Sequence, residues 1–161
     1  MFRKAILITL SVKNNNMKIQ YRKLQLSDLR ATYEIRFSVF ENLIRAEHVK
    51  YLQRDAALAD IEQGGGCICL VEGREVGFCL PLFIPEPYLA ALFVMPEFQG
   101  VGIGSELLEH ALSWYKSNGA AQVCLETDAN SLAEKFYLGR GWEKKGEAEL
   151  PFQNRYCIGL K

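Results

Sequence analysis

The chain has 161 residues, a length that suits one domain with a substantial hydrophobic core. Hydrophobic residues make up 49% and charged residues 24%, and 19 basic side chains balance 19 acidic ones. The sequence shows no basic cluster and no apolar run long enough to span a bilayer, so we expect neither nucleic acid nor a membrane as a partner. This composition is typical of an ordinary soluble globular protein.

The first sixteen residues differ in character from the chain that follows them. A basic start and a short apolar run resemble a weak secretory signal, but no A-x-A-like cleavage site follows. Lys13 and three asparagines come next, and Met17 opens a clean strand pattern. We therefore expect residues 1–16 to be an extension ahead of a single domain over residues 17–161.

The segments expected to be regular in the first half of the domain are a strand at 19–24, a helix from 29 to about 43, a second helical stretch that ends at glycines 64–66, a hairpin of strands at 67–71 and 76–80, and a strand at 88–94. Ser27 and Asp28 resemble an N-cap for the first of these helices. Pro85 and Pro87 separate the hairpin from the strand that follows it.

The segments expected in the second half are an amphipathic helix from Ile103 to Asn118, a strand at 121–127, a short helix at 131–138, a strand from Trp142 and a last strand at 154–160. Ser131 and Glu134 have the spacing of a capping box. One strand–helix–strand unit predicts a right-handed crossover between parallel strands. The fold class is therefore α/β of a mixed, α+β-like kind, with a mostly antiparallel sheet and one parallel βαβ unit.

Five cysteines lie among strand-like apolar residues, an odd number that favours no disulfide framework. Cys67 and Cys69 are spaced to share one face of a strand rather than to form a CxxC knuckle. The two histidines, His48 and His110, show no zinc-ligand spacing, so we expect no metal. We expect reduced, mostly buried cysteines in a cytoplasmic protein.

A glycine-rich turn between a strand and a helix is the most informative local feature of the chain. The segment from Gln99 to Gly104 holds three glycines at alternate positions, directly before a helix N-terminus. Unpaired N–H groups and the helix dipole make such a place suitable for a phosphate. The third glycine comes one residue too early for a dinucleotide fingerprint, and no Gly-Lys-Ser/Thr follows as in a Walker A loop. A pyrophosphate-bearing acyl carrier remains as the ligand.

Two motifs resemble the GNAT superfamily of acyl-CoA N-acyltransferases. Gln99, Gly102 and Gly104 match the family's phosphate motif, Q/R-x-x-G-x-G/A. The residues that match its second pattern, N-x-x-A-x-x-F-Y-x-x-x-G-F/W, are Asn130, Ala133, Phe136, Tyr137, Gly141 and Trp142. The similarity runs in element order from about residue 17 to 160, and in motif detail from about 90 to 142.

This resemblance implies acetyl-CoA as co-substrate and a GNAT-type fold. The residues that it implies for acetyl-CoA binding are Leu92, Phe93 and Val94 through their backbone along the pantetheine arm, Gln99, Gly100, Val101, Gly102, Ile103, Gly104 and Ser105 around the pyrophosphate, and Asn130 and Phe136 along the channel.

The resemblance also implies that Tyr137 lies near the thioester sulfur and protonates the departing thiolate. A tyrosine with a pKa of about 10 can donate this proton without being easily lost to ionisation. The family's usual carboxylate on the strand before the turn is missing. Glu126, on the neighbouring parallel strand, is the nearest candidate base, with Glu41, a water-mediated route or an already neutral amine as alternatives.

The acceptor side of the site is expected at the end of the first helix. Arg36, Glu41 and Asn42 are candidate substrate-binding residues, and their spacing resembles one group of small bacterial-type family members. Glu41 suits a cationic amine, while Arg36 or Arg45 suits a carboxylate on an amino-acid-like acceptor. We treat His48 as a surface residue.

The sequence thus predicts an acetyl-CoA-dependent N-acetyltransferase, a monomer or homodimer, that acts on a primary amine of a small molecule or a peptide. Two alternatives belong to other classes of protein. One is an acyl-CoA-binding or sensing module without transfer activity, and the other is a nucleotide-binding oxidoreductase, which the glycine spacing disfavours.

Overall fold

The computed structural model describes residues 17–161, so the expected extension at 1–16 lies outside the described residues. The strands are β1 (Ile19–Lys23), β2 (Cys67–Val71), β3 (Arg74–Leu82), β4 (Tyr88–Val94), β5 (Gln122–Asp128), β6 (Glu143–Glu147) and β7 (Gln153–Gly159). The helices are α2 (Leu29–Ser38), α3 (Arg54–Glu62), α4 (Ile103–Ser117) and α5 (Leu132–Leu138), with 3-10 turns η1 (Leu26–Asp28), η2 (Ala46–Leu52) and η3 (Pro96–Phe98). In this part of the chain no helix is long and apolar enough to cross a membrane.

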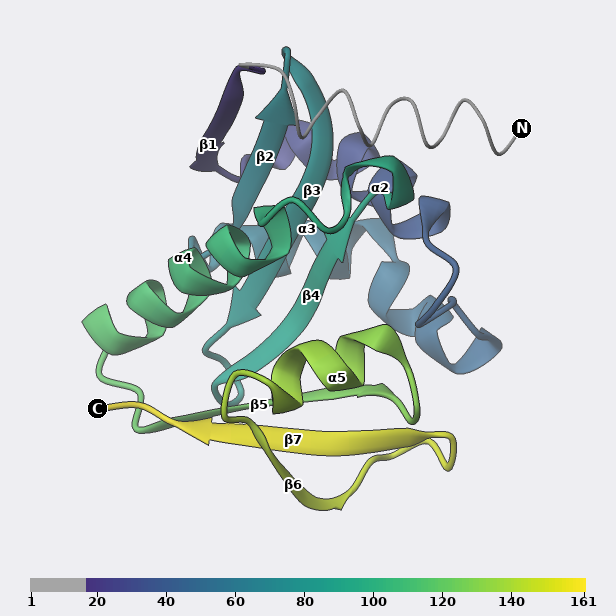
Figure 1. Cartoon of the computed structure of the whole chain (residues 1–161), viewed down its shortest axis with the longest axis vertical. Helices are drawn as coiled ribbons and strands as arrows, with labels where there is room; N and C mark the ends of the chain where they lie inside the picture. The colour runs from purple at the N-terminus through teal and green to yellow at the C-terminus, as the bar shows by residue number, and fades with distance from the viewer. Residues whose placement is uncertain (1–16) are drawn as a thin grey trace.

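One mixed sheet, in the order β1-β2-β3-β4-β5-β7-β6, runs through the molecule, with α4 on one face and α2 and α3 on the other (Figure 1). Successive side chains of β3 point to opposite faces of the sheet, and helices cover both faces. A Cβ at Gly77 would point at Leu107 of α4, whereas the next side chain, Phe78, faces Arg36 of α2. The mixed α/β architecture expected from the sequence is confirmed.

The parallel pair β4–β5 is joined at one point only. Tyr88 pairs with Cys124, and the Cys124 N–H donates to the Pro87 carbonyl at 3.3 Å. Beyond that point β4 rises through the molecule while β5 runs beneath α5, so the strands diverge (Figure 1). The remainder of β4 keeps its antiparallel pairing with β3. The other edge of β4 is open toward the space between the diverging strands β4 and β5, which we call the wedge.

The first helix is shorter than the sequence predicted. It ends at Ser38, and Val39 is already extended, with ψ 160°. The following loop turns back at Asn42, where φ is +51°, and this asparagine bonds to the end of β5. The helical spacing of apolar residues continued past this point, but the long-range bond to β5 decides where the chain leaves the helix.

Asp28 also differs from its expected role as an N-cap. Its carboxylate makes no capping bond to the helix. Instead it accepts both Nη groups of Arg22, at 2.8 and 2.9 Å, and the N–H of Gln25 at 2.8 Å. The ion pair and these hydrogen bonds lower the pKa of Asp28. The residue therefore joins the end of β1 to the start of α2.

The expectation that all cysteines are reduced is wrong for two of them. Cys124 and Cys157 lie opposite each other in the antiparallel β5–β7 pair, with Cα atoms 4.0 Å apart, and form a disulfide. The two are 33 residues apart in sequence, so only the strand register brings them together. The free cysteines, Cys67, Cys69 and Cys79, are buried as expected.

Candidate active site

Within residues 17–161, a row of backbone N–H groups in the glycine turn has no backbone partner. The first N–H of α4 to bond back is that of Glu106, to the carbonyl of Gly102 at 3.1 Å. Gly100 and Gly102 adopt φ values of +77° and +96°, which favour glycine. The groups between Gly100 and Ser105 therefore lie at the positive end of a 15-residue helix, an arrangement that suits a pyrophosphate.

Two side chains hold this turn in place. Gln99 donates from Nε2 to the carbonyl of Val94 at 2.8 Å and so ties the turn to the end of β4. Arg140, beyond α5, donates from Nη2 to Ser105 Oγ and stacks over the Phe136 ring, 3.7 Å from its centroid. Arg140 places a positive charge beside the turn. Sequence reasoning missed it because no local pattern links it to Ser105, 35 residues away.

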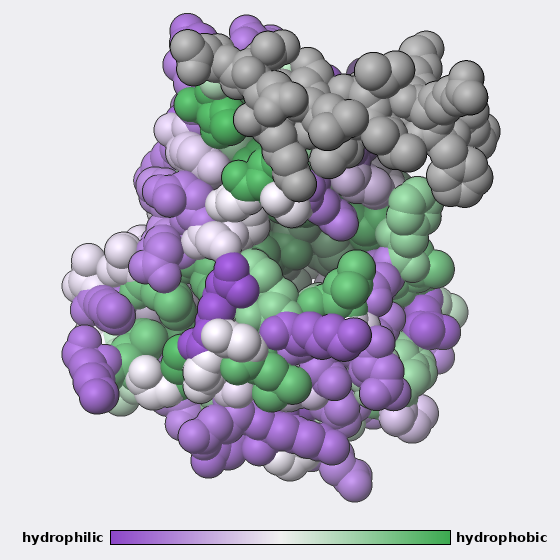
Figure 2. Space-filling view, in the orientation of Figure 1, coloured by the Kyte–Doolittle hydropathy of each residue, from purple (hydrophilic) through white to green (hydrophobic). Residues whose placement is uncertain are grey.

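The wedge between β4 and β5 lies next to this turn. The backbone of Leu92, Phe93 and Val94 bonds to β3 on one side and has no β5 partner on the other. Phe136 lies close to Gly104, and Asn130 is exposed in the turn before α5, with φ +61°. Over β4, between the start of α4 and α5, the surface is hollowed above a mainly hydrophobic floor (Figure 2). The residues expected to bind acetyl-CoA thus border one continuous region, and their binding role stays a prediction.

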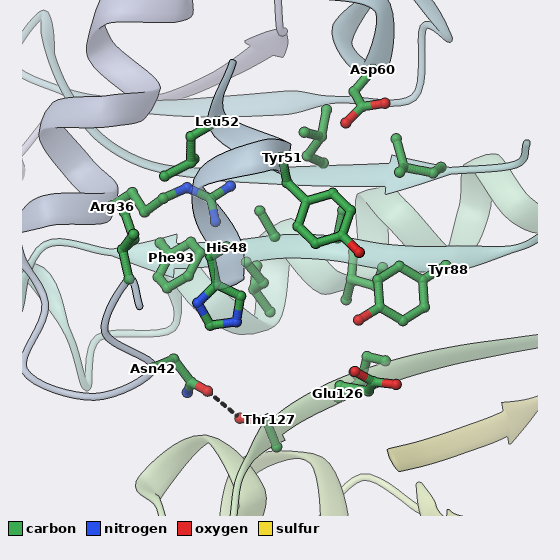
Figure 3. Close-up of a pocket in the computed structure, with 18 of the residues that line it drawn as sticks. Arg36, Asn42, His48, Tyr51, Leu52, Asp60, Tyr88, Phe93, Glu126 and Thr127 are labelled. Carbon is green, nitrogen blue, oxygen red and sulfur yellow. Dashed lines mark hydrogen bonds between the residues drawn. The ribbon is translucent and has the colours of Figure 1, made fainter. Parts of the chain in front are cut away.

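On the α2–α3 side of the sheet lies a cavity of about 410 Å³. Its polar lining includes Arg36, Asn42, Glu47, His48, Tyr51, Asp60, Tyr88, Glu126, Tyr137, Glu149 and Arg155 (Figure 3). The cavity combines an apolar wall with many ionisable groups, and a concave site of this kind suits a polar small molecule. Within residues 17–161 no cluster of side chains suits a metal ion.

Tyr137 belongs to this cavity and is buried, with 6% of its surface exposed. Its ring packs edge-on against Phe136 and Trp142, at centroid distances of 5.1 and 5.3 Å. Burial raises the pKa of Tyr137, so its hydroxyl keeps its proton across the neutral and mildly alkaline range. The residue is held rigidly and is protonated, as an acid for a thiolate must be before it acts.

Glu126 also lines the cavity, and its side chain is 17% exposed. Desolvation raises the pKa of its carboxyl, while Arg155, whose Nη1 lies 3.7 Å away, partly offsets that effect. Tyr88 lies close by at the start of β4 (Figure 3). A carboxylate with a raised pKa is a stronger base than an exposed one, which fits a role in taking a proton from an amine.

Two of the three candidate acceptor-binding residues line the cavity, and the third does not. Arg36 and Asn42 line the cavity. The Asn42 carbonyl oxygen accepts from Thr127 Oγ1 at 3.1 Å, so its other amide atom remains for a ligand (Figure 3). Glu41 is not among the lining residues, since its carboxylate accepts the N–H of Leu132 at the start of α5. The structure therefore places Glu41 as a helix cap rather than as a base.

His48 is a cavity residue, although the sequence suggested a surface position. Its Nδ1 accepts the N–H of Arg45 at 3.1 Å, which leaves the proton of the neutral ring on Nε2. His48 can therefore donate a hydrogen bond into the cavity, but its Nδ1 is already used. No local sequence pattern marks it, because its position depends on how η2 packs over the sheet.

Comparison with known proteins gives one family match. The model of the acetyltransferase (GNAT) family matches residues 29–142 of the chain. No curated protein is similar enough in sequence to match it.

Solved structures with a similar fold include three N-acetyltransferases. The PaiA N-acetyltransferase of Thermoplasma acidophilum, in complex with coenzyme A, is 19% identical with a TM-score of 0.76, over 89% of this chain and 99% of that one. The ribosomal-protein-S18-alanine N-acetyltransferase of Escherichia coli is 20% identical with a TM-score of 0.71, over 89% and 94%. An N-acetyltransferase of Staphylococcus aureus Mu50 is 20% identical with a TM-score of 0.69, over 89% and 99%. At these identities the likeness shows the fold.

Proposed function

Since the chain belongs to the acetyltransferase (GNAT) family, as its two motifs predicted, we propose that it is an acetyl-CoA-dependent N-acetyltransferase. It transfers the acetyl group to a primary amine of a small molecule or peptide. The observation that carries this proposal is that two half-sites border the wedge between β4 and β5. The unpaired N–H groups of the glycine turn lie on one side of it, and the cavity with Tyr137 and Glu126 lies on the other.

The reaction needs a neutral amine, stabilisation of an oxyanion and a proton for the leaving thiolate. In the proposed mechanism Glu126 takes a proton from the ammonium group. The amine nitrogen then forms a bond to the thioester carbon, and the carbonyl oxygen faces N–H groups on the open edge of β4. As the carbon–sulfur bond breaks, Tyr137 gives its proton to sulfur. The nitrogen, which became cationic on attack, releases its second proton to solvent, and Tyr137 regains a proton from solvent. The products are the N-acetyl amide and CoA.

Structures with a similar fold support acetyl-CoA as the donor, and they do not narrow the class of acceptor. The Thermoplasma acidophilum protein holds coenzyme A, and the name of the Escherichia coli enzyme gives it a protein alanine as acceptor. A cytoplasmic location and a monomeric or homodimeric state remain predictions for this chain.

The competing function is an acyl-CoA-binding module that transfers nothing. The observation that favours it is the absence of a carboxylate from β4, whose sequence is Tyr-Leu-Ala-Ala-Leu-Phe-Val. Under this alternative the protein binds acetyl-CoA but no amine accelerates the release of CoA.

Replacing Tyr137 by phenylalanine tests the proposed function. We expect kcat for amine acetylation to fall about 100-fold, because general-acid assistance is typically worth at least that factor. The Kd for acetyl-CoA should change little, because Phe keeps the ring packing against Phe136 and Trp142. Thiol release with a panel of amines measures the rate, and calorimetry measures binding.

The control replaces Tyr115, a buried tyrosine of α4 that does not line the cavity, by phenylalanine, and kcat should not change. An unchanged kcat in Tyr137→Phe would remove this residue from the mechanism. Binding of acetyl-CoA with no turnover on any amine would favour the binding module, and no binding of acetyl-CoA or CoA would end the proposal.

A further inference from the structure

Arg36 is a half-buried cation without an anionic partner among residues 17–161. Its guanidinium lies over the rings of Phe93 and Phe78, 4.9 and 5.8 Å from their centroids. These ring faces attract the positive charge. They do not accept hydrogen bonds from the N–H groups, which lie in the plane of the guanidinium. Among residues 17–161 no hydrogen bond or ion pair to Arg36 is formed, and its nitrogen atoms are not sealed from the cavity. Figure 3 shows the group projecting into the cavity beside Phe93 and His48.

The surroundings of Arg36 do not neutralise it. Burial lowers the pKa of Arg36 to about 10, with smaller opposing effects from Tyr33 and Asp60, so the group remains charged near neutrality. Asp60 is the carboxylate whose charge acts on it, yet the two form no ion pair. Leaving a desolvated charge unpaired is costly, so an anionic ligand that pairs with Arg36 recovers that cost.

The other guanidinium that lines the cavity, that of Arg155, is paired with carboxylates. Its nitrogen atoms lie 3.2 Å from Glu86 and 3.7 Å from Glu126. Glu126 and Arg36 lie on opposite sides of the cavity in Figure 3. Arg45, the other cation considered for the acceptor, does not line the cavity and stacks on Phe152 at 3.8 Å. Among residues 17–161, Arg36 is therefore the guanidinium of the cavity lining that no carboxylate pairs, although the charge of Asp60 acts on it, whereas Glu126 lies across the cavity beside Arg155.

From the unpaired Arg36 and from Glu126 across the cavity we infer that the acceptor is a zwitterionic amino acid, whose carboxylate pairs with Arg36 while its amine faces Glu126. The inference rests on the proposed function and narrows its acceptor. A planar carboxylate matches the two-pronged geometry of a guanidinium. A doubly charged phosphate fits less well, because five carboxylates, those of Glu47, Asp60, Glu86, Glu126 and Glu149, also line the cavity. Its wall of Leu80, Leu82 and Leu89 favours an apolar side chain on the acceptor.

Matched acceptors test the inference. Each of several apolar amino acids is compared with its carboxamide and with the amine that lacks the carboxyl group, in the wild-type protein. We expect kcat/KM to be about 10-fold to 100-fold higher for the amino acid, the usual range for a charged hydrogen-bonded pair. The carboxamide is the decisive comparison, because its amine is less basic than that of the amino acid and more of it is neutral, so basicity works against the expected order. The amine without a carboxyl group is more basic than the amino acid, so basicity alone would give the expected order there. A series of ω-amino acids of increasing length then measures how far apart the acceptor's carboxylate, at Arg36, and its amine, at Glu126, must lie.

Variants of Arg36 test whether this residue causes the preference for the amino acid over its carboxamide. Arg36→Gln should abolish the preference by raising KM for the amino acid about 10-fold to 100-fold, with kcat/KM for the carboxamide nearly unchanged. Arg36→Lys should restore part of the preference. Arg30→Gln is the matched control on the same helix, since Arg30 is 91% exposed and pairs with Glu34 outside the cavity. Thermal melting and the Kd for acetyl-CoA check that each variant folds.

Each outcome separates the inference from the proposed function. If amines are acetylated with no preference for the carboxylate, or if the preference survives Arg36→Gln, the inference is wrong and the transferase remains. A rise in the Kd for acetyl-CoA alone would assign Arg36 to the donor and overturn the inference. If neither amino acids nor other amines are acetylated, the proposed function itself fails.

Discussion

Three ionisable side chains of the cavity are altered by the same cause, their removal from water. Desolvation raises the pKa of Glu126 and so makes its carboxylate a better base. It raises the pKa of Tyr137, which keeps the hydroxyl protonated. It lowers the pKa of Arg36 to about 10, which leaves the guanidinium charged but poorly compensated. All three shifts disfavour the charged form, so the cavity stores free energy that a bound acceptor can recover.

Glu126→Gln is expected to stabilise the protein while lowering its activity. The pKa of Glu126 is raised from 4.5, so the folded state binds its proton more tightly than the unfolded state does. The free energy of unfolding therefore falls as the pH rises through this window, and the loss persists at neutral pH. The variant should lose this pH-dependent decrease, which urea titrations at pH 5 and pH 8 measure.

In the same variant kcat/KM should fall about 100-fold, because the proposed base is gone. A variant that is less stable than the wild type at pH 8 would contradict the assigned cause of the shift. Full activity would show that the amine loses its proton by another route.

The turn before α4 is the element in which backbone conformation matters most for binding. Gly102, the residue before the helix, has φ +96°, where a side chain is strained. Gly104 lies in the helix, and a Cβ there would meet Phe136 at an ordinary 3.8 Å. The two glycines of the family motif therefore differ in why they are glycine. Gly102 adopts a positive φ that strains other residues, whereas Gly104 only lies near the ring of Phe136.

A pair of alanine variants separates these reasons. Gly102→Ala should raise the Kd for acetyl-CoA about 10-fold, because relieving roughly 1–2 kcal/mol of left-handed strain turns the N–H groups away from the ligand. Gly104→Ala should bind nearly as the wild type does. Calorimetry with acetyl-CoA measures both, and equal losses in the two variants would contradict the assignment.

At the scale of the molecule, the sheet consists of two halves that meet at one residue pair, Tyr88 with Cys124. β1 to β4 form one half, and β5 to β7, with a disulfide of their own, form the other. A ligand that lies in the wedge contacts both halves. We therefore expect acetyl-CoA to couple them and to stabilise the whole domain rather than one loop.

This expectation predicts a thermal shift. At an acetyl-CoA concentration of 100 times Kd the stabilisation is about 2.7 kcal/mol, which corresponds to a rise in Tm of roughly 5–10 °C for a domain of this size. NAD should produce no shift. Amide exchange should slow on the open edge of β4 and in β5 together, and slowing confined to the glycine turn would show that the two halves are not coupled.

Much of the fold could be predicted from the sequence because its signals are local. The strand at Tyr88–Val94 and the helix after the glycines were placed correctly, since hydrophobic period and glycine positions report directly on the backbone. Ser131 caps α5 as expected, accepting the N–H of Glu134. The other half of that capping box is not formed, because the Glu134 carboxylate accepts the hydroxyl of Tyr156 from β7.

By itself the sequence determined the family and the mixed α/β fold, because the motif residues lie within short stretches whose conformation is set locally. Only the tertiary structure decided which side chains share the cavity. It brought His48 in, left Glu41 at the start of α5 and joined Cys124 to Cys157. It also left the half-buried Arg36 without an ionic partner among residues 17–161. These outcomes depend on how α2, η2 and β7 pack against distant strands, and contacts over such separations leave no periodic trace in the sequence.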